Sequence, residues 1–548
     1  MDYEKLASLL FGSVDKSPEY WEEKYPPRDL PKEAMVTRLA PSPTGFIHLG
    51  NLYGALADER MAHQSGGVFY LRIEDTDKKR EVENGVEIII KTLKYFNINF
   101  DEGEQTDGFK GEYGPYRQQK RKEIYQTYVK ELVKNGRAYP CFCTEEELAE
   151  MRERQEAQKL NFGYYGSFAK YRDASFELIE ENIKKGLPYV VRFKSMGNIE
   201  KRVEVEDLIR GTLNMPQNDQ DIVILKSDGI PTYHFAHAVD DHLMHTTHVV
   251  RGEEWLATLP VHIELFEALG FKMPKYAHTA QLMKMDGESK RKLSKRKDPE
   301  LSLDYYRGEG YLPAAVLKYL MTVLNSNFED YTIANPDASI YDFKFSAKKM
   351  SISGSLFDLS KLNDVSKDIL CVLDAEDIYT QMAEWALEFD KEFYGIFTKD
   401  KDFTIKALSV GKGGNKPRKD LINWRQAKDF LGFYYDELFK IEDELPENIK
   451  MDEAKKIIDE YLKGYNHKDE QSVWFDKIRQ IAEQNGYASQ MKDYKKNPEN
   501  YKGHIGDVSA VLRLGITGRL NSPDFHQISQ IIGENRARKR LEDFCKSF

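Results

Sequence analysis

Two segments of this chain, about 240 residues apart, hold side chains suited to phosphate chemistry. The first is RLAPSPTGFIHLGN, residues 38–51, and the second is RKLSKRK, residues 291–297. The first would offer backbone N–H groups and a helix N-terminus to an anion, and the second would offer lysines. Phosphate chemistry needs positive charge where negative charge builds up in the transition state. Together the segments predict a site for a triphosphate.

The first segment reads as a strand that ends at a Pro/Gly turn, followed by a helix that starts at an H-x-G triplet. Free N–H groups and the positive end of the helix dipole would face an anion. Gly50 would let a nucleotide lie against the backbone. His48 and Asn51 are three residues apart, on one face of the first turn. Alone, the pattern also fits an ordinary strand–turn–helix with a capping histidine.

The second segment places six positive or polar side chains in seven residues. Its functional interpretation is a mobile lysine clamp for a triphosphate. Alone, the run more often marks a solvated basic loop, because such loops are common. The specificity comes from the two segments together, in this order and within one α/β pattern.

The elements around the first segment form a strand, turn, helix and strand unit, the start of a parallel α/β sheet. The predicted strands are 35–42 and 68–75, and the predicted helices are 49–64, 84–96 and 117–135. Between about 107 and 226 the pattern becomes irregular, which indicates an insertion. The α/β pattern resumes at 221–236 and 246–255, and helices dominate from about 312.

The composition sets the broad class. With 548 residues the chain is too long for one hydrophobic core, so roughly two to four domains are expected. The net charge of −11 argues mildly against nucleic-acid binding unless the cations gather on one face. No apolar run of transmembrane length and no signal-peptide pattern is present, so the cytoplasm is the expected location. Four cysteines do not make a disulfide framework.

Considered together, the two segments resemble the H-I-G-H and K-M-S-K-S signatures of class I aminoacyl-tRNA synthetases. The string APSPTGFIHLGN, with RIEDTD at 72–77, resembles the glutamyl branch, whereas relatives that use glutamine typically carry a Pro-Glu-Pro-Asn-Gly-type turn. The similarity continues through 226–255 and 350–362 and then becomes diffuse. The chain is similar to bacterial-type glutamyl-tRNA synthetases.

This resemblance implies an α/β Rossmann-like catalytic domain with an inserted α+β acceptor-stem domain, followed by an all-α anticodon-binding half. The implied divisions are an N-terminal extension at 1–34, a catalytic domain at 35–325 with the insertion at about 107–226, a stem-contact domain at 326–370 and a helical anticodon-binding domain at 371–548.

The resemblance also implies the activity, a glutamate–tRNA ligase. L-Glutamate would attack ATP, with Mg²⁺ present, to form glutamyl-adenylate, and the 3′-terminal adenosine of tRNA-Glu would then accept the glutamyl group. In this family the first step also requires bound tRNA. Whether tRNA-Gln is charged too stays open. A monomer without a membrane partner is expected.

Matched positions carry the family's roles over to this chain. The glutamate pocket would comprise Arg38, Ala40, Ser42, Glu74, Tyr233, His237 and Arg251. The ATP site would comprise Thr44, His48, Gly50, Asn51, Glu254, Trp255 and Lys295. The catalytic set would be His48, Lys292, Ser294 and Lys295, with Lys295 the more direct transition-state contact. Arg38 would pair with the side-chain carboxylate and Glu74 would accept the α-ammonium. A structural Arg38–Glu74 ion pair is the alternative.

Three positions depart from the family pattern. Asn51 replaces the second histidine of H-I-G-H, and His237 stands where many relatives have Asn. Some relatives hold zinc in the inserted domain, beginning with C-x-C as in Cys141-Phe-Cys143, but Phe168 and Lys170 stand where further ligands would be. Two thiolates cannot complete a tetrahedral site, so no zinc is expected.

Residues 407–430 are locally basic within an acidic chain. They are either a solvated face or a contact for the anticodon arm, with Arg418 the leading candidate for a base-edge contact and Lys416 and Lys419 for phosphate.

Three other classes of protein fit the sequence less well. Small adenylyltransferases lack a long helical half, a non-catalytic homologue would not need the two lysines, and a short paralogue that modifies a tRNA base lacks residues 370–548.

Overall fold

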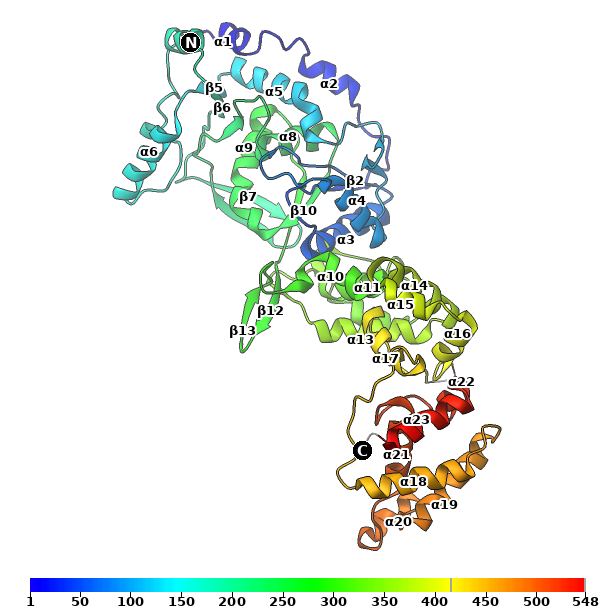
Figure 1. Ribbon diagram of the computed structural model, residues 1–548. Helices are drawn as coiled ribbons and strands as arrows, with labels where there is room; N and C mark the ends of the chain where they lie inside the picture. Colours follow the sequence, from blue (N-terminus) through cyan, green and yellow to red (C-terminus); the bar gives the residue numbers. More distant parts are fainter. Residues whose placement is uncertain (414–415, 547–548) are drawn as a thin grey trace. The chain divides into compact units, whose positions relative to one another are not determined.

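A computed structural model of the chain describes residues 1–413 and 416–546 (Figure 1). Its contacts divide the chain into two compact units. The N-terminal unit comprises Met1–Tyr305 with Leu317–Asp358, and the C-terminal unit comprises Tyr306–Val316 with Leu359–Phe548. The finer division drawn from the sequence, with boundaries after 325 and 370, stays a prediction. None of the helices in the described part of the chain is long and apolar enough to cross a membrane.

The N-terminal unit is organised by two hydrogen-bonded sheets. In the first, β1 (Val36–Leu39), β2 (Val68–Leu71) and β3 (Glu102–Gln105) run parallel, and β4 (Gly108–Lys110) is antiparallel to β3. In the second, β10 (His248–Gly252), β11 (Lys275–Thr279) and β7 (Arg202–Asp207) run parallel, and β8 (Gly211–Pro216) is antiparallel to β7. The two sheets meet where Thr247 N–H donates to the Val36 carbonyl at 3.0 Å. Strand order therefore reverses between β1 and β10, and ligands of α/β sheets bind outside the carboxyl ends of strands at such a point.

Helix α3 (Leu49–Gln64) follows β1 and packs on β1, β2 and β10 (Figure 1). Its bounds match the prediction from the sequence. The predicted strand 35–42 is shorter in the structure because the prolines at 41 and 43 interrupt it. The helix predicted at 84–96 is confirmed as α4 (Gly85–Tyr95), and the one at 117–135 as η1 (Gln118–Arg121) with α5 (Lys122–Lys134).

The first 34 residues belong to the core of the N-terminal unit, where the sequence suggested only an extension. They form α1 (Tyr3–Leu10) and α2 (Pro18–Lys24), and α1, α2 and α5 share one apolar cluster. Trp21 Nε1 donates to Thr127 Oγ1 at 3.1 Å, so the indole is buried with its polar atom satisfied.

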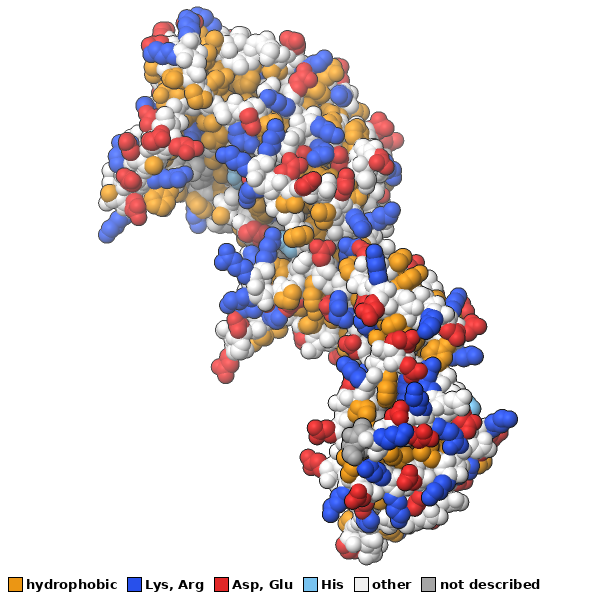
Figure 2. Space-filling view, in the orientation of Figure 1, with side chains coloured by type: hydrophobic (Ala, Val, Ile, Leu, Met, Phe, Trp, Pro, Cys, Tyr) orange, Lys and Arg blue, Asp and Glu red, His pale blue; other side chains and the backbone are white. Residues whose placement is uncertain are grey.

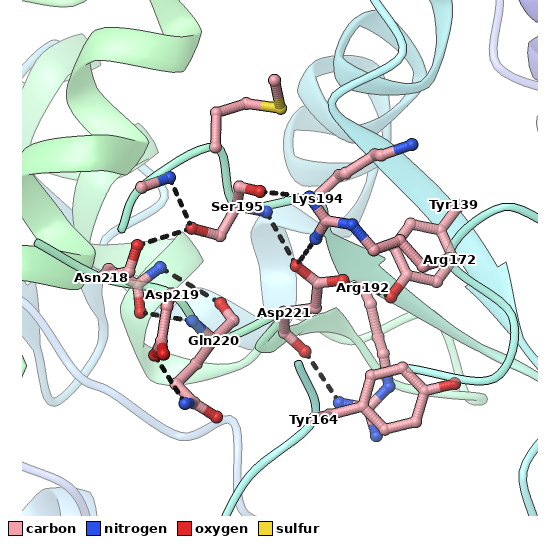
Figure 3. Close-up of polar contacts among 12 residues, drawn as sticks. Tyr139, Tyr164, Arg172, Arg192, Lys194, Ser195, Asn218, Asp219, Gln220 and Asp221 are labelled. Carbon is pink, nitrogen blue, oxygen red and sulfur yellow. Dashed lines mark hydrogen bonds and ion pairs between the residues drawn. The ribbon is translucent and has the colours of Figure 1, made fainter. Parts of the chain in front are cut away.

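The irregular middle segment contains a separate antiparallel sheet of β5 (Ala138–Cys141), β6 (Val190–Phe193) and β9 (Val223–Leu225). Helices α6 (Glu145–Ala157) and α7 (Phe176–Lys184) lie between the first two of these strands. Figure 3 shows the polar contacts that fix its loops on one buried carboxylate, Asp221. That carboxylate accepts from Tyr139 Oη at 2.6 Å, from the Ser195 N–H at 2.9 Å and from Arg172. Because every donor comes from a different loop or strand, the segment is held as one piece.

Further elements complete the N-terminal unit. They include α8 (Tyr233–Leu243), η3 (Glu253–Thr258), α9 (Leu259–Leu269), β12 (Leu282–Asp286), β13 (Ser289–Lys292), η4 (Pro299–Leu301), α12 (Phe328–Ala334) and β14 (Ser355–Leu356). Helices α10 (Leu303–Glu309) and α11 (Pro313–Leu324) each contribute residues to both units. The second basic segment begins in β13 and continues into the turn that follows.

The C-terminal unit is helical, as predicted. Its helices from α13 on are Leu359–Val372, Ala375–Phe389, Lys391–Phe397, Lys401–Ser409, Trp424–Leu431, Met451–Gly464, Gln471–Gln484, Met491–Lys496, Ile505–Thr517, Phe525–Ile532 and Glu534–Lys546. An Asp or Asn side chain accepts a backbone N–H in the first turn of several of them, at Asp374, Asp390, Asp400, Asn423 and Asp524. Figure 2 shows Lys and Arg side chains mixed with Asp and Glu over its visible face.

Candidate active site

A cleft of about 510 Å³ opens at the carboxyl ends of β1 and β10. Most of the predicted site residues line it, from both motifs and from the strands between them: Arg38, Ala40, Ser42, His48, Gly50, Asn51, Glu74, Tyr233, Arg251, Glu254, Trp255, Lys292 and Lys295. Thr44, Ser294 and His237 do not line it, and Arg418 lies in the C-terminal unit. The structure thus brings together residues that the sequence separates by more than 200 positions.

The two motifs lie side by side. The chain just after the second motif pairs with the first: Ser302 forms a β-bridge with His48, and the Leu303 N–H donates to the Ile47 carbonyl at 3.4 Å. A Cβ at Gly45 would lie 3.7 Å from Lys295 Nζ. The turn of the first motif and the lysines of the second therefore face one cleft, as a triphosphate site requires.

The basic segment is anchored through Arg291 and Ser294, while its lysines stay exposed. The Arg291 guanidinium pairs with Asp298 through both Nη atoms, at 2.5 and 2.8 Å, and the Ser294 N–H donates to Asp298 at 2.9 Å. The hydrogen bond from Arg291 holds the pKa of the buried Asp298 carboxyl well below its usual range. Lys292 and Lys295 are exposed and line the cleft. Figure 2 shows Lys and Arg side chains gathered beside the β12–β13 hairpin.

His48 stands at the N-terminus of α3 as its N-cap residue. Its backbone N–H donates to Asn51 Oδ1 at 3.1 Å, so Asn51 holds the turn that presents the imidazole. Burial, and then Lys295, lower the pKa of His48, which keeps the ring neutral near pH 7. Its Nδ1 atom is buried and has no hydrogen-bond partner among the described residues. A Cβ at Gly50 would lie 3.1 Å from that atom, so glycine leaves room for the ring.

At the other end of the cleft, Arg38 and Glu74 have separate partners. Arg38 Nε lies 3.4 Å from Asp241 Oδ2, and Glu74 Oε1 accepts from Arg72 Nη2 at 3.1 Å. The ion pair between Arg38 and Glu74 that was considered as an alternative is therefore not formed. Burial opposes ionisation of Asp241, but Arg72 and Arg38 hold its pKa well below the usual range. Burial raises the pKa of Glu74, and Arg72 opposes that rise.

His237 lies beneath the pocket rather than in its lining. Its ring stacks on Tyr233 at 5.9 Å between centroids, its Nδ1 lies 3.0 Å from Asp241 Oδ2, and its Nε2 lies 2.9 Å from Tyr276 Oη. Burial lowers its pKa to about 4. The imidazole is therefore neutral near pH 7, and it supports Tyr233 from behind. Tyr233 in turn packs on Trp255 at 4.4 Å between centroids.

Arg251, at the end of β10, is the second buried arginine of the cleft, with 8% of its surface exposed. It stacks over the Tyr276 ring at 4.6 Å. Within the part of the chain that the structure describes, its Nη2 has no hydrogen-bond partner. Buried donors are nearly always satisfied, so an unpaired guanidinium nitrogen beside a cleft is typical of a site that receives an anion.

Two acids of the site were not singled out from the sequence. Asp241 bridges Arg38 and Arg72, and Asp58 of α3 lines the cleft while 1% exposed. Burial raises the pKa of Asp58 well above its usual value, and its Oδ1 has no partner. The signal in the sequence was the triplet Asp58-Glu-Arg60 inside an otherwise apolar helix, because buried charges need a reason to be there.

The cysteine pair of the inserted segment does not fit a zinc site. Cys141 Sγ and Cys143 Sγ lie 3.4 and 3.6 Å from the Tyr164 hydroxyl, so a tyrosine stands beside both thiols. Lys170 pairs with Glu147 instead of facing the thiols. Within residues 1–413 and 416–546, no group of His, Cys, Asp and Glu is arranged to hold a metal ion. The expectation of no zinc stays a prediction that this geometry supports.

In the C-terminal unit, the basic segment 407–430 includes Gly414 and Asn415, which lie outside the described residues. Arg418 pairs with Asp420, Nε to Oδ2 at 2.6 Å and Nη2 to Oδ1 at 3.0 Å. Lys419 pairs with Asp368 at 2.5 Å, and Lys412 Nζ donates to two carbonyls at the end of α13. Much of the positive charge of this segment is therefore compensated within the unit.

Comparisons with known proteins agree with this geometry. The family "tRNA synthetases class I (E and Q), catalytic domain" matches residues 34–364. A glutamate–tRNA ligase of Acetivibrio thermocellus is 58% identical over 99% of this chain and its own full length. One from Clostridium perfringens is 51% identical over the same shares. The crystal structure of a glutamate tRNA ligase from Elizabethkingia meningosepticum, in complex with its amino acid, is 27% identical with a TM-score of 0.73 and covers 94% of this chain and all of its own.

The fold and the site thus define a class I aminoacyl-tRNA synthetase. More closely, the chain belongs to the glutamate–tRNA ligases of the family that charges tRNA with glutamate or glutamine. The resemblance read from the two motifs is confirmed, as is the predicted fold class, a Rossmann-like catalytic region followed by a helical half.

Proposed function

We propose that the cleft activates L-glutamate with ATP and passes the glutamyl group to the 3′-terminal adenosine of tRNA-Glu. The observation that carries this proposal is the division of the cleft into two charged ends. Two buried arginines, Arg38 and Arg251, stand at one end, and the exposed Lys292 and Lys295 with a helix N-terminus stand at the other. The first end suits a dicarboxylic amino acid and the second suits a triphosphate.

At the amino-acid end, Arg38 takes the side-chain carboxylate of glutamate through its planar guanidinium. Asp241 holds that guanidinium in place, with Arg38 Nε 3.4 Å from Asp241 Oδ2. Because this contact is long, part of the positive charge of Arg38 stays available to the ligand. Glu74 accepts the α-ammonium, and Arg251 with Tyr233 closes the pocket. Ala40 and Ser42 supply the wall beside β1.

At the nucleotide end, the N-terminus of α3 and the neutral imidazole of His48 receive the phosphates. Gly50 and Asn51 shape that turn, and Thr44 in the turn before it acts through the backbone, since its side chain does not line the cleft. Glu254 and Trp255 line the wall where the adenosine lies.

The first step joins a glutamate α-carboxylate oxygen to the α-phosphorus of ATP, and pyrophosphate leaves. Lys295 and Lys292 neutralise the charge that grows on the phosphates, with Lys295 the more direct contact. Ser294 serves through its backbone N–H, which ties the lysine segment to Asp298. In the second step the 2′-hydroxyl of the terminal adenosine attacks the mixed anhydride and AMP leaves. Positioning and electrostatics carry both steps, because no protein nucleophile is needed.

Mg²⁺ fits this site as an ion that arrives on ATP. The described residues offer no cage of three or more metal-ligating side chains, and Mg²⁺ characteristically binds substrate phosphates with few protein carboxylates. Glu254, exposed at the cleft, is the carboxylate that could contact it. Bound there, the ion supplies charge neutralisation of the phosphates.

The C-terminal unit binds the anticodon arm, with Arg418 as the base-reading side chain once it exchanges Asp420 for a base edge. The whole protein acts as a cytoplasmic monomer.

The proposed reaction is tested by incubating the protein with labelled glutamate, ATP and purified tRNA-Glu. The expected product is tRNA esterified with glutamate at its 3′ end, released by mild base. Absence of ester with folded protein and intact tRNA would refute the proposal.

A further inference from the structure

Arg251 contacts two imidazoles, whereas Arg38 of the cleft and Arg72 behind it face acids. Its Nε donates to His278 Nε2 at 2.9 Å, and its Nη1 lies 3.0 Å from His262 Nδ1. Arg72, by contrast, lies 2.5 Å from Asp241, and Arg38 lies 3.4 Å from the same acid. Two nitrogens of Arg251, Nε and Nη1, are thus held by imidazoles rather than by carboxylates.

The hydrogen bonds assign one tautomer to each histidine. A guanidinium only donates, so His278 Nε2 and His262 Nδ1 must both accept. His278 Nδ1 then carries the proton, which it donates to Asp207 Oδ2 at 2.7 Å. His262 Nε2 carries its own proton and donates to His234 Nδ1 at 2.9 Å.

Burial supports these neutral states. His262 and His278 have no exposed surface, and burial lowers the pKa of both. Burial lowers the pKa of His234 to about 4. A protonated imidazole at either contact would turn an N–H toward an N–H of Arg251, so the arrangement requires neutral rings.

Neutral acceptors have a consequence that acids would not have. A carboxylate in contact with a guanidinium neutralises it and competes with a carboxylate ligand, whereas an imidazole orients it and leaves its charge intact. Arg251 Nη2 is buried and has no hydrogen-bond partner among residues 1–413 and 416–546. The imidazoles therefore orient the guanidinium without neutralising it, and Tyr233, which lines the cleft, is its other polar neighbour.

We infer that His262 and His278 are positioning residues that hold Arg251 charged and oriented for a carboxylate of the amino-acid substrate, with His234 and Asp207 fixing their tautomers. This inference rests on the proposed binding of glutamate in the cleft. The four residues come from α9, β11, α8 and β7, so the position of Arg251 depends on four separate elements of the N-terminal unit.

The test compares substitutions that remove the acceptor with ones that keep it. His262→Phe and His278→Phe retain an aromatic ring but cannot accept from Arg251, while His262→Gln and His278→Gln keep an amide oxygen. The expected result is a KM for glutamate raised about tenfold or more in the Phe variants, a KM for ATP within about twofold, and Gln variants within about threefold of the parent. His248→Phe is the matched control, because His248 lies on the strand of Arg251 but its imidazole Nδ1 lies 2.8 Å from Thr247 Oγ1 instead of contacting Arg251.

Equal KM values for glutamate in the Phe, Gln and control variants would overturn the inference. If the Phe variants fail to fold, the comparison of His262→Glu with His262→Gln decides. Both introduced side chains can accept a hydrogen bond from Arg251, but only the introduced carboxylate neutralises its charge. We expect a KM for glutamate about tenfold higher in the Glu variant, and equal values would overturn the inference. Failure of the parent protein to activate glutamate would refute the proposed function instead, so the two failures are distinguishable.

Discussion

Removal of the Lys295 ammonium is the perturbation that probes the nucleotide end of the cleft most sharply. Lys295 lines the cleft beside the turn of the first motif, with its Nζ close to Gly45. Because the segment is anchored through Arg291 and Asp298, Lys295→Ala should leave the fold of the segment intact. The loss is then one positive charge at the reacting phosphates.

The magnitude follows from Coulomb's law. Opposite charges about 4 Å apart interact by about 4 kcal/mol at an effective dielectric constant of about 20. Lys295 is exposed, so solvent screens part of this, and about 3 kcal/mol remains as the cost in the transition state. That energy corresponds to a fall of about a hundredfold in kcat for adenylate formation. The KM for glutamate should change little, because the contact strengthens only as charge develops.

The assay is ATP–pyrophosphate exchange with glutamate in the presence of tRNA, which reports adenylate formation alone. Lys297→Ala is the matched control, since Lys297 is an exposed lysine of the same segment that does not line the cleft. It should keep kcat within about threefold. An unchanged kcat in Lys295→Ala, or equal losses in both variants, would refute the assigned role.

Other predictions test the remaining parts of the account. Arg38→Ala should abolish discrimination between glutamate and glutamine in kcat/KM, and a variant that still rejects glutamine while activating glutamate normally would contradict its role. Arg418→Ala should change the ratio of tRNA-Glu to tRNA-Gln charging, whereas Lys416→Ala should weaken both alike and reduce the salt dependence; equal, salt-sensitive losses would reduce the segment to an electrostatic landing surface. Burial lowers the pKa of His237 from 6.5 to about 4, so the unfolded chain binds a proton at a higher pH than the folded chain does. The free energy of unfolding should therefore fall by about 2 kcal/mol through this group as the pH falls from 7 to 5. His237→Asn should flatten that fall in urea unfolding, and parallel curves for the two proteins would count against the buried neutral ring. Cys143→Ser should keep full activity, and the parent protein should contain well under one zinc per chain by elemental analysis.

The local architecture of the first motif was readable from the sequence because its signals are local. The turn prolines, Gly50 and the Gly66-Gly67 pair bracket the helix, and α3 runs over the residues expected, Leu49–Gln64. The approach of the second motif to the first was available only through the family resemblance. No pattern in the sequence states that Ser302, which follows the second segment, will pair with His48 of the first.

The partners of the buried charges could not be predicted in the same way. Arg38 and Asp241 are 203 positions apart, and Trp21 and Thr127 are 106 apart. Such contacts depend on how strands and helices stack, and a sequence pattern reports only the face on which a residue lies. His237 was placed in the pocket by its matched position, yet one further layer of packing puts it behind Tyr233.

Some features were visible and passed over. Arg418 and Asp420 are two residues apart, so the ion pair that restrains Arg418 could have been expected from the sequence. The first 34 residues contain Trp21 and Tyr25, large aromatic side chains that are seldom left in solvent. Both are buried, which makes this segment part of the catalytic core's support.

The measurement that tests the central claim most directly is ATP–pyrophosphate exchange with each protein amino acid, with and without purified tRNA. Two arginines at one end of the cleft and two lysines at the other predict exchange with glutamate alone. The family resemblance adds the expectation that this exchange requires tRNA. Exchange driven by glutamine or by an uncharged amino acid, or no exchange with glutamate in the presence of intact tRNA-Glu, would contradict the account.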